Sequence, residues 1–519
     1  MPATDPVSRS HAAVLVTVSA VVAVGTGELA GGLVQAWRSP VQAVAESVID
    51  RSPSALTRFG IRTFGTNDKL ALVVGILVIL AAVAPLLGLA ARRRPTAAVV
   101  GFAAFGAVGV LASLDGGTPW SAVPSVAAGL AGAAVVLLAH PLVAAARPVP
   151  PGAPGAAAPA PPGRVGRREL LAGAGALTAL GLVMAAGGRA IGSRFSAAAS
   201  RAALVLPGAR RPLPAPPAGA ELGIDGLAPL YTPNSSFYRI DTALTIPQVP
   251  AEDWTLRVHG MVDDPFEIDF DELVSLGMVE ADVTLTCVSN RLGGDLVGNA
   301  RWLGVPLRTL LDRAGVDPDA DQIVGRSVDG YTCGFPLDAA YDRTCLVAIG
   351  MNGEPLPLQH GFPARLVTAG LYGYVSATKW LGEIELTRFD RFEQYWVPRG
   401  YAARAPIKTM SRIDVPRSGQ IVDAGDTVIA GVAWAQTRGI AKVEVRIDDG
   451  PFVEAELAEA LGADTWRQWR LPWTATEGAH RLAVRATDGD GRVQTEERAD
   501  PLPDGAAGWQ SLLVTVRAT

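Results

Sequence analysis

Long apolar runs fill much of the first 190 residues and give way to mixed apolar and polar segments afterwards. Each run is near the length that an α-helix needs to cross the hydrocarbon core of a bilayer. The pattern therefore predicts a membrane domain over residues 1–190 with about five transmembrane helices. The runs cover residues 12–34, 69–90, 97–113, 122–146 and 169–188.

Basic residues beside these runs predict the orientation of the membrane domain. Three arginines at 92–94 follow the second run, and Arg167 and Arg168 precede the fifth. Because cytoplasmic loops carry an excess of Lys and Arg, both loops are expected on the cytoplasmic side. An odd number of spans then places the chain after about residue 190 outside the cytoplasmic membrane.

The two arginines before the fifth run also belong to a short motif, Gly166-Arg167-Arg168-Glu169-Leu170-Leu171. It resembles a twin-arginine export signal that stands inside the chain rather than at its start. Two arginines before a span are also the ordinary pattern of a positive-inside anchor. The sequence leaves both interpretations open.

Stretches rich in Pro and Ala indicate the borders between domains. Residues 147–163 and 206–219 are of this kind and have no means of forming a packed core, so they are expected to be linkers. The second stretch lies in a predicted linker at 191–220.

Two folded domains are expected after this linker. Short strand patterns such as 254–258 and short helices such as 306–314 indicate an α+β domain over 221–403. From 404 to 519 apolar and polar residues alternate between turn signals, as around 443–447. This pattern predicts an all-β, immunoglobulin-like C-terminal domain.

Charge and cysteine content exclude two classes of protein. The net charge of −5 offers no basic stripe for phosphates, so no nucleic-acid partner is expected. Three cysteines, Cys287, Cys333 and Cys345, are too few for a disulfide scaffold. Cys333 and Cys345 could form one bridge or remain two buried thiols, the second being the more common arrangement.

Cys287 is the candidate metal ligand. A thiolate is a soft ligand that suits a high-valent transition metal, whereas a lone cysteine at a strand end is more often a small core residue. The chain has no CxxC, HExxH, GxGxxG or GxxxxGK[ST] motif, which disfavours zinc, iron–sulfur and nucleotide chemistry. One thiolate suffices where the cofactor brings the remaining ligands.

Three potential cations follow within twenty residues of one another. His360, Arg365 and Lys379 are joined by glycine-rich turns, an arrangement that can hold a phosphate or pyrophosphate tail. Scattered surface cations are the alternative interpretation.

The two clusters together resemble the sulfite-oxidase family of molybdopterin enzymes. The resemblance rests on Cys287-Val288-Ser289-Asn290-Arg291, its continuation to Leu307, and His360-Gly361-Phe362-Pro363-Ala364-Arg365. It covers the chain from about Pro233 to the C-terminus. It implies an α+β cofactor domain, then an immunoglobulin-like domain through which a homodimer can form.

The resemblance also implies roles for individual residues. Cys287 would be the protein ligand to molybdenum and part of the catalytic set, with Tyr401 and Arg239. Tyr331 would line the same pocket. The residues implied to bind the molybdopterin cofactor are Asn234, Tyr238, Arg239, Asp329, His360, Arg365, Ser376 and Lys379.

One departure from the family pattern concerns the substrate. Sulfite oxidases carry two consecutive arginines after the Cys-x-x-Asn sequence, and here Leu292 follows Arg291. The expected function is therefore oxygen-atom transfer on a small oxyanion or S-oxide, by a multi-pass protein of the cytoplasmic membrane with an extracytoplasmic catalytic domain. A sulfoxide reductase resembling the periplasmic methionine-sulfoxide reductase subunit is one alternative, and a non-catalytic membrane-anchored binding module is another.

Electrons are expected to pass to an external partner. The apolar runs contain only His11 and His140 near their ends, without paired histidines on facing helices. Because an internal haem relay needs such pairs, the partner is expected to be a cytochrome or a quinone-linked protein.

Overall fold

The computed structural model describes residues 7–518, except 54–55, 57–58, 61–62, 65–66, 115–117 and 146–166. The expected linker at 147–163 and Gly166 of the arginine motif therefore lie outside the described residues. The chain forms two compact units. The first comprises residues up to Ser196 with Ala243–Thr245, and the second comprises Ala197–Thr242 and Ile246–Thr519.

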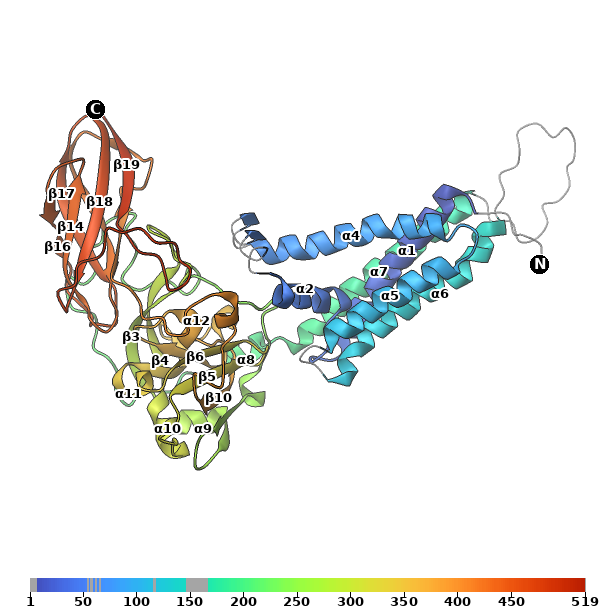
Figure 1. The fold of residues 1–519 in the computed structure, drawn as a ribbon, viewed down its shortest axis with the longest axis horizontal. Helices are drawn as coiled ribbons and strands as arrows, with labels where there is room; N and C mark the ends of the chain where they lie inside the picture. The colour runs from blue at the N-terminus through green and yellow to red at the C-terminus, as the bar shows by residue number, and fades with distance from the viewer. Residues whose placement is uncertain are drawn as a thin grey trace, which may run out of the picture. The chain divides into compact units, whose positions relative to one another are not determined.

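The first unit is helical, as predicted. In its described residues, five helices are long and apolar enough to cross a membrane, and Figure 1 shows them as a bundle. A shorter helix, α2 (Pro40–Arg51), begins with a capping box formed by Ser39 and Gln42. The long helices are α1 (Arg9–Leu33), α4 (Asp68–Ala90), α5 (Thr96–Ser113), α6 (Val123–Ala145) and α7 (Arg167–Gly192).

Glycines allow helices α1 and α7 to pack backbone against backbone. A Cβ atom added to Gly25 would lie 2.1 Å from the carbonyl oxygen of Gly181, and one added to Gly32 would lie 2.0 Å from that of Gly188. Small residues at such crossings are typical of helices that associate in membranes. The α7 helix is therefore tightly packed against α1.

The second unit begins with two sheets, one mixed and one antiparallel, and short helices. One sheet has the strand order β2-β1-β10-β5-β6, and the other has the order β3-β4-β7-β8 with β9 paired to β7. This arrangement confirms the α+β architecture. The first sheet contains β1 (Thr255–Gly260), β2 (Phe266–Asp269), β5 (Gln322–Ser327), β6 (Thr332–Pro336) and β10 (Leu381–Thr387). The second contains β3 (Val279–Thr286), β4 (Val297–Pro306), β7 (Cys345–Met351), β8 (Glu354–Pro355) and β9 (Arg365–Thr368).

Four short helices, α9 to α12, pack with these sheets. The sheets and helices share one hydrophobic core. The helix α10 has a strongly one-sided pattern, with Leu307, Leu310 and Leu311 buried. Large aromatic side chains such as Trp254 and Trp302 are fully buried in the same core. The helices are α9 (Phe270–Ser275), α10 (Leu307–Ala314), α11 (Ala339–Asp342) and α12 (Gly373–Ser376).

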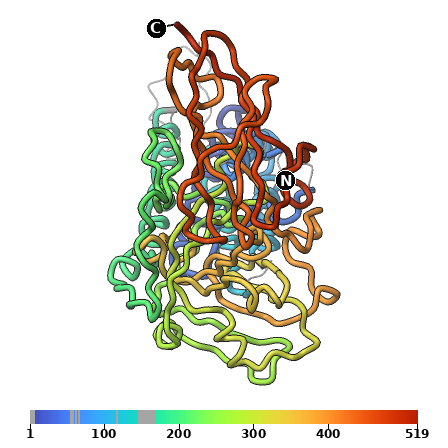
Figure 2. Tube along the Cα trace, turned by 90° about the vertical axis from the view of Figure 1, so that its left-hand side faces the viewer, coloured from blue at the N-terminus to red at the C-terminus, as the bar shows by residue number. Residues whose placement is uncertain are grey.

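The C-terminal part of the second unit is all-β in its described residues. Its two sheets have the orders β11-β13-β17-β16 and β12-β19-β18-β14-β15. Figure 2 shows their strands in orange and red, running alongside one another. The strands are β11 (Met410–Val415), β12 (Ile421–Asp423), β13 (Gly425–Trp434), β14 (Ile440–Ile447), β15 (Phe452–Glu454), β16 (Glu456–Leu457), β17 (Arg467–Ala475), β18 (Gly478–Asp488) and β19 (Gln510–Arg517).

Buried hydrogen bonds tie the strand β3 to the C-terminal strands. The Thr284 hydroxyl accepts a bond from the backbone N–H of Trp466 at 2.7 Å, and Gln436 donates to the Thr284 carbonyl at 2.8 Å. Removing one partner of a buried hydrogen bond typically costs about 1–3 kcal/mol. These bonds therefore hold in place the strand that leads to Cys287.

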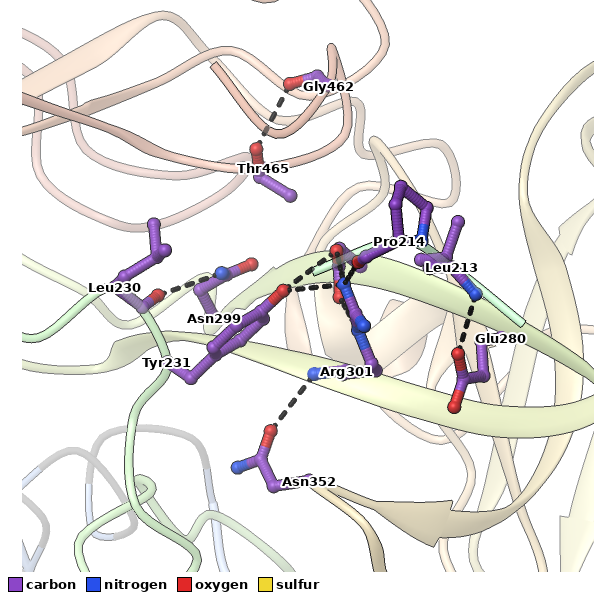
Figure 3. A network of polar contacts seen from close by, with 11 residues as sticks. Leu213, Pro214, Leu230, Tyr231, Glu280, Asn299, Arg301, Asn352, Gly462 and Thr465 are labelled. Atoms are coloured by element: carbon purple, nitrogen blue, oxygen red, sulfur yellow. Dashed lines mark hydrogen bonds and ion pairs between the residues drawn. The ribbon is translucent and has the colours of Figure 1, made fainter. Parts of the chain in front are cut away.

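A polar network between β3 and β4 also holds β3 in place (Figure 3). Arg301 on β4 donates to the carboxylate of Asp282 on β3 and to the Tyr231 hydroxyl, each at 2.9 Å. Asn299 donates to the Leu230 carbonyl at 2.9 Å. The network connects the segment before the first sheet to the β3–β4 pair.

All three cysteines are free and buried. The sulfur of Cys333 lies 2.7 Å from the Thr378 hydroxyl, and that of Cys345 lies 3.1 Å from the Thr368 hydroxyl. Of the two arrangements left open by the sequence, the structure has the pair of buried thiols.

Candidate active site

A cavity with about 750 Å³ of empty volume, including its opening to solvent, lies within the second unit. Its wall is formed by the segment 237–242, the end of β3, the turn between β5 and β6, and parts of the segment 360–396. Its volume is in the range of small-molecule and cofactor sites. Both sheets of the α+β part contribute to it, so the site depends on how this whole part packs.

Cys287 follows β3 directly and lies in the cavity wall. Its backbone N–H donates to the Leu296 carbonyl at 2.9 Å, and its own carbonyl accepts from Asn290 at 3.0 Å. The Asn290 side chain in turn accepts from the Leu296 N–H at 3.0 Å. Burial raises the pKa of the Cys287 thiol, although hydrogen bonds with Ser289 lower it. A bound metal ion would be needed to stabilise the thiolate here.

Arg365 begins β9 as a buried cation in the cavity wall, with 5% of its surface exposed. Its guanidinium donates to the carbonyls of His360 at 3.1 Å and Leu366 at 3.3 Å, and lies over the Trp302 ring. Burial lowers the pKa of Arg365 to about 10. Since a buried charge is costly unless it is paired, this side chain is suited to an anion entering the cavity.

Lys379 reaches the cavity as the buried member of a charge cluster. Its ammonium donates to Asp241 at 2.8 Å and to the Gln359 carbonyl at 3.2 Å. Arg239 donates to the same Asp241 carboxylate at 2.8 Å. Burial lowers the pKa of Lys379 to about 8, against the opposing effect of Asp241. Two cations share one carboxylate, so the cluster keeps a positive charge.

His360 lines the cavity together with the cations Arg365 and Lys379. Its ring packs edge-on against Phe237 with 5.7 Å between centroids. Burial lowers the pKa of His360 to about 4, and the charges of Arg365 and Lys379 act in the same direction. His360 is therefore neutral at pH 7 and becomes a better proton acceptor when an anion offsets its neighbours.

Aromatic residues form another part of the wall. The Tyr331 hydroxyl donates to the Tyr374 carbonyl at 2.9 Å, and the Tyr374 hydroxyl donates to the Ala402 carbonyl at 2.6 Å. Trp396 lines the cavity beside them. Asp329, in the turn between β5 and β6, accepts from the Tyr331 N–H at 3.1 Å.

Seven of the residues proposed from the sequence line this one cavity, although 92 positions separate Cys287 from Lys379. The chain brings them together through β3, β9 and the loops beside them. The seven are Cys287, Tyr238, Asp329, Tyr331, His360, Arg365 and Lys379.

The other four proposed residues are not in the cavity lining. Asn234 donates its amide to the Met351 carbonyl at 3.1 Å. Ser376 is fully buried and donates to the carbonyls of Leu371 and Tyr372. Tyr401 packs against the rings of Tyr374 and Trp396, and Arg239 pairs with Asp241. Tyr401 and Arg239 thus contact residues that line the cavity, whereas Asn234 and Ser376 bond carbonyls outside its lining.

Asp241, Tyr374 and Trp396 are among the lining residues that were not proposed from the sequence. Asp241 is the only acid between 226 and 251, and it follows Arg239 by two positions. That isolated acid was a signal that could have drawn attention to it. Tyr374 and Trp396 lie in a short helix and a loop, where no periodic pattern predicts which way a ring points.

The donor set fits an anionic cofactor that brings most of its own metal ligands. No cluster of three or more His, Cys, Asp or Glu residues that could hold a metal occurs in the part of the chain that the structure describes. A single thiol stands in the cavity beside buried Arg365 and Lys379. A molybdopterin, with its dithiolene sulfurs and its phosphate, has the complementary chemistry.

Comparison with known proteins gives the same result. Residues 243–396 match the family described as "Oxidoreductase molybdopterin binding domain". Human mitochondrial sulfite oxidase is 27% identical over 316 residues, which are 51% of this chain and 57% of that protein. The uncharacterized oxidoreductase YuiH of Bacillus subtilis (strain 168) is 34% identical over 151 residues, which are 29% of this chain and 73% of that protein.

Among solved structures, the sulfane dehydrogenase SoxCD from Paracoccus pantotrophus is similar with a TM-score of 0.49 and 21% identity, over 56% of this chain and 82% of that chain. The chain spans little more than half the length of human sulfite oxidase, 57%. The activity, substrate and partners of that whole protein are therefore proposals for this one. The domain match and the shared sequence identify the enzyme and its molybdopterin cofactor, and the chain belongs to the sulfite-oxidase family of molybdopterin-dependent oxidoreductases.

Proposed function

We propose that this protein is a membrane-anchored oxidoreductase that transfers an oxygen atom to or from a small oxyanion or S-oxide outside the cytoplasmic membrane. One observation carries the proposal: the Cys287 thiol and the buried Arg365 cation, which donates only to carbonyls among the described residues, line the same cavity. A thiol alone would fit an ordinary core, and a buried cation alone would fit many anion sites. Their combination fits a metal cofactor with an anionic tail.

The residues of the cavity have distinct roles in this proposal. Cys287 supplies the thiolate ligand, and Arg365 and Lys379 hold the anionic part of the cofactor by charge. His360, whose pKa is lowered by the charges of these cations, would hydrogen-bond the cofactor as a neutral imidazole. When bound, the molybdenum cofactor supplies two-electron redox chemistry coupled to oxygen transfer.

Neighbouring side chains outside the cavity lining keep the residues of the cavity in position. Asn234, Arg239 and Ser376 act through the residues they contact, since their side chains bond carbonyls or Asp241 rather than line the cavity. Tyr401 fixes Tyr374 and Trp396 from behind. Residues that orient the groups in contact with a metal cofactor commonly adjust the affinity and reactivity of the metal site.

The remaining parts of the chain have supporting functions in the proposal. The domain at 1–190 anchors the protein through its five apolar helices, and the linker at 191–220 leads to the catalytic domain at 221–403. The two C-terminal sheets support an immunoglobulin-like domain at 404–519 through which two copies can associate. An external cytochrome or a quinone-linked protein exchanges the electrons.

The test uses the purified full-length protein in detergent. Molybdenum and pterin content are measured first, and turnover is then measured anaerobically with sulfite plus an electron acceptor and with methionine sulfoxide plus a reduced dye. The proposal expects molybdenum close to one atom per chain and turnover in one of the two assays. Protein that lacks molybdenum and pterin after expression in a cofactor-producing host would contradict it and favour a non-catalytic binding module.

A further inference from the structure

Two chemically different sets of side chains line the cavity that contains Cys287. The cationic set consists of the cations Arg365 and Lys379 together with His360, a neutral imidazole whose pKa is lowered by their charges. Asp329 and Tyr331 belong to the other set, and charge coupling relates Tyr331 to Asp329 and to Cys287. The cavity thus has a part suited to an anionic cofactor and a part of different character.

The second part is an aromatic wall, which we define as Tyr331, Tyr374 and Trp396. All three line the cavity. Both tyrosine hydroxyl protons are used in bonds to main-chain carbonyls. The wall therefore offers ring surface to a ligand more than it offers hydrogen-bond donors.

Other rings hold this wall in place. Tyr395 contacts Tyr331 and Trp396 with centroid distances of 5.6 and 5.2 Å. Tyr401 contacts Tyr374 and Trp396 at 5.4 and 5.3 Å. Each distance is in the range of favourable aromatic pairs. The wall is consequently preorganised, and a ligand loses little affinity in ordering it.

Asp329 brings a negative charge to this wall. Its Oδ1 atom accepts the Tyr331 N–H at 3.1 Å, which fixes the carboxylate next to the wall. All the cations that line the cavity in the described residues belong to the cationic set. An oxyanion approaching the wall would meet the Asp329 carboxylate and three aromatic side chains that carry no positive charge, an environment that disfavours negative charge.

We propose that Asp329 and the aromatic wall form a substrate subsite for organic S-oxides or thioethers that carry a positively charged substituent, in preference to inorganic oxyanions such as sulfite. The inference rests on the proposed oxygen-transfer function and specifies its substrate class. Ring faces with an adjacent carboxylate are the usual means of recognising an alkylated cation. Reduction of such an S-oxide consumes two electrons and two protons, breaks the S–O bond and releases the thioether and water, with electrons from the external partner or a reduced dye.

Three probes of different charge test the subsite. They are (2-methylsulfinylethyl)trimethylammonium, dimethyl sulfoxide and sulfite, and their binding to the detergent-solubilised full-length protein is followed by calorimetry. Binding does not depend on turnover, so the subsite is tested even where the oxygen-transfer function fails. The cationic sulfoxide is expected to bind at least tenfold more tightly than sulfite.

Matched variants assign the selectivity to named residues. Asp329→Asn keeps the size of the side chain and removes its charge, and it is expected to reduce the preference for the cationic over the neutral sulfoxide about tenfold, in Kd and in kcat/KM. Trp396→Leu should weaken both sulfoxides. Asp423→Asn, an exposed acid on β12 outside the cavity, should change neither. Tighter binding of sulfite to the unaltered protein, or an unchanged preference in Asp329→Asn, overturns the proposal.

Discussion

The guanidinium of Arg365 donates a hydrogen bond to the main-chain carbonyl of His360 at 3.1 Å, so the two side chains are held on one side of the cavity. Each has a lowered pKa, to about 10 for Arg365 and to about 4 for His360, and burial is the main cause of both. In the apoprotein, burial therefore disfavours the positively charged forms of both side chains. Such an arrangement is expected of a site whose anion contributes part of the stability of the loaded protein.

Replacing Arg365 by Met should therefore separate stability from cofactor binding. Met fills much of the same buried volume without a charge, so the apoprotein is expected to be as stable as the unaltered protein or more stable. Molybdenum and pterin content should fall at least tenfold, because the anionic tail loses its cation. Thermal unfolding of apoprotein and metal analysis of purified protein measure the two effects. A Met variant with full cofactor content would show that Arg365 does not hold the cofactor.

The lowered pKa of His360 predicts a pH dependence of stability. The unfolded chain takes up a proton near pH 6.5, whereas the folded apoprotein takes it up near pH 4. Stability is therefore complete above pH 6.5 and is lost as the pH falls toward 4. At pH 5 the loss is roughly 2 kcal/mol relative to pH 7.

A His360→Gln variant is the control for this effect. It has no titrating ring, so its apoprotein should lose less stability between pH 7 and pH 5, measured as the decrease in Tm. Equal losses in the two proteins would mean that the pKa of His360 is not lowered by folding.

Cys287→Ser should abolish turnover and leave the fold intact. Serine has nearly the same size, so the β3 end and its bonds to Leu296 and Asn290 can remain. A hydroxyl is a harder and poorer ligand for a high-valent metal than a thiolate. Steady-state turnover is compared with Tm and cofactor content, and activity near that of the unaltered protein would remove Cys287 from the metal site.

The parts of the fold with a strong local signal were predictable from the sequence. A run long enough to span a bilayer is itself the signal, so the five long helices could be placed by length alone. Cys287 and the stretch around His360 and Arg365 were identified through their motifs, and the structure brings them to one cavity. These residues are constrained by chemistry rather than by the local backbone.

The direction of individual side chains could not be predicted in the same way. Ser376 was proposed as a cofactor ligand, yet its hydroxyl bonds the carbonyls of Leu371 and Tyr372, a choice set by the local turn. Tyr374 and Trp396 are 22 positions apart, and the ring of Tyr401 contacts both of them. Contacts of this kind depend on tertiary packing, and no periodic pattern of residues in the sequence predicts them.

The packing of α1 against α7 predicts a position-specific effect of adding one methyl group. In Gly25→Ala the new Cβ atom would lie 2.1 Å from the Gly181 carbonyl oxygen, so the two helices must separate. Gly173 on α7 has no atom within 4 Å of its added Cβ, and Gly173→Ala is the matched control. The first variant should lower the Tm in detergent by several degrees, whereas the control should leave it unchanged or raise it slightly because Ala favours a helix.

The last prediction concerns Arg167 and Arg168, which begin helix α7. A domain that encloses a large pterin is loaded most readily before it crosses the membrane, which favours export of the folded domain through the twin-arginine route. Replacing both arginines by lysine keeps the positive charge that sets topology, so a plain anchor predicts no change. Export through the twin-arginine route predicts instead that the second unit stays on the cytoplasmic side, protected from protease added to intact cells. Because a reversal of topology would give the same protection, the position of the loop at 92–94 is mapped in parallel. Full protease sensitivity of the second unit in the double-lysine variant would exclude the export signal while leaving the molybdenum site unaffected.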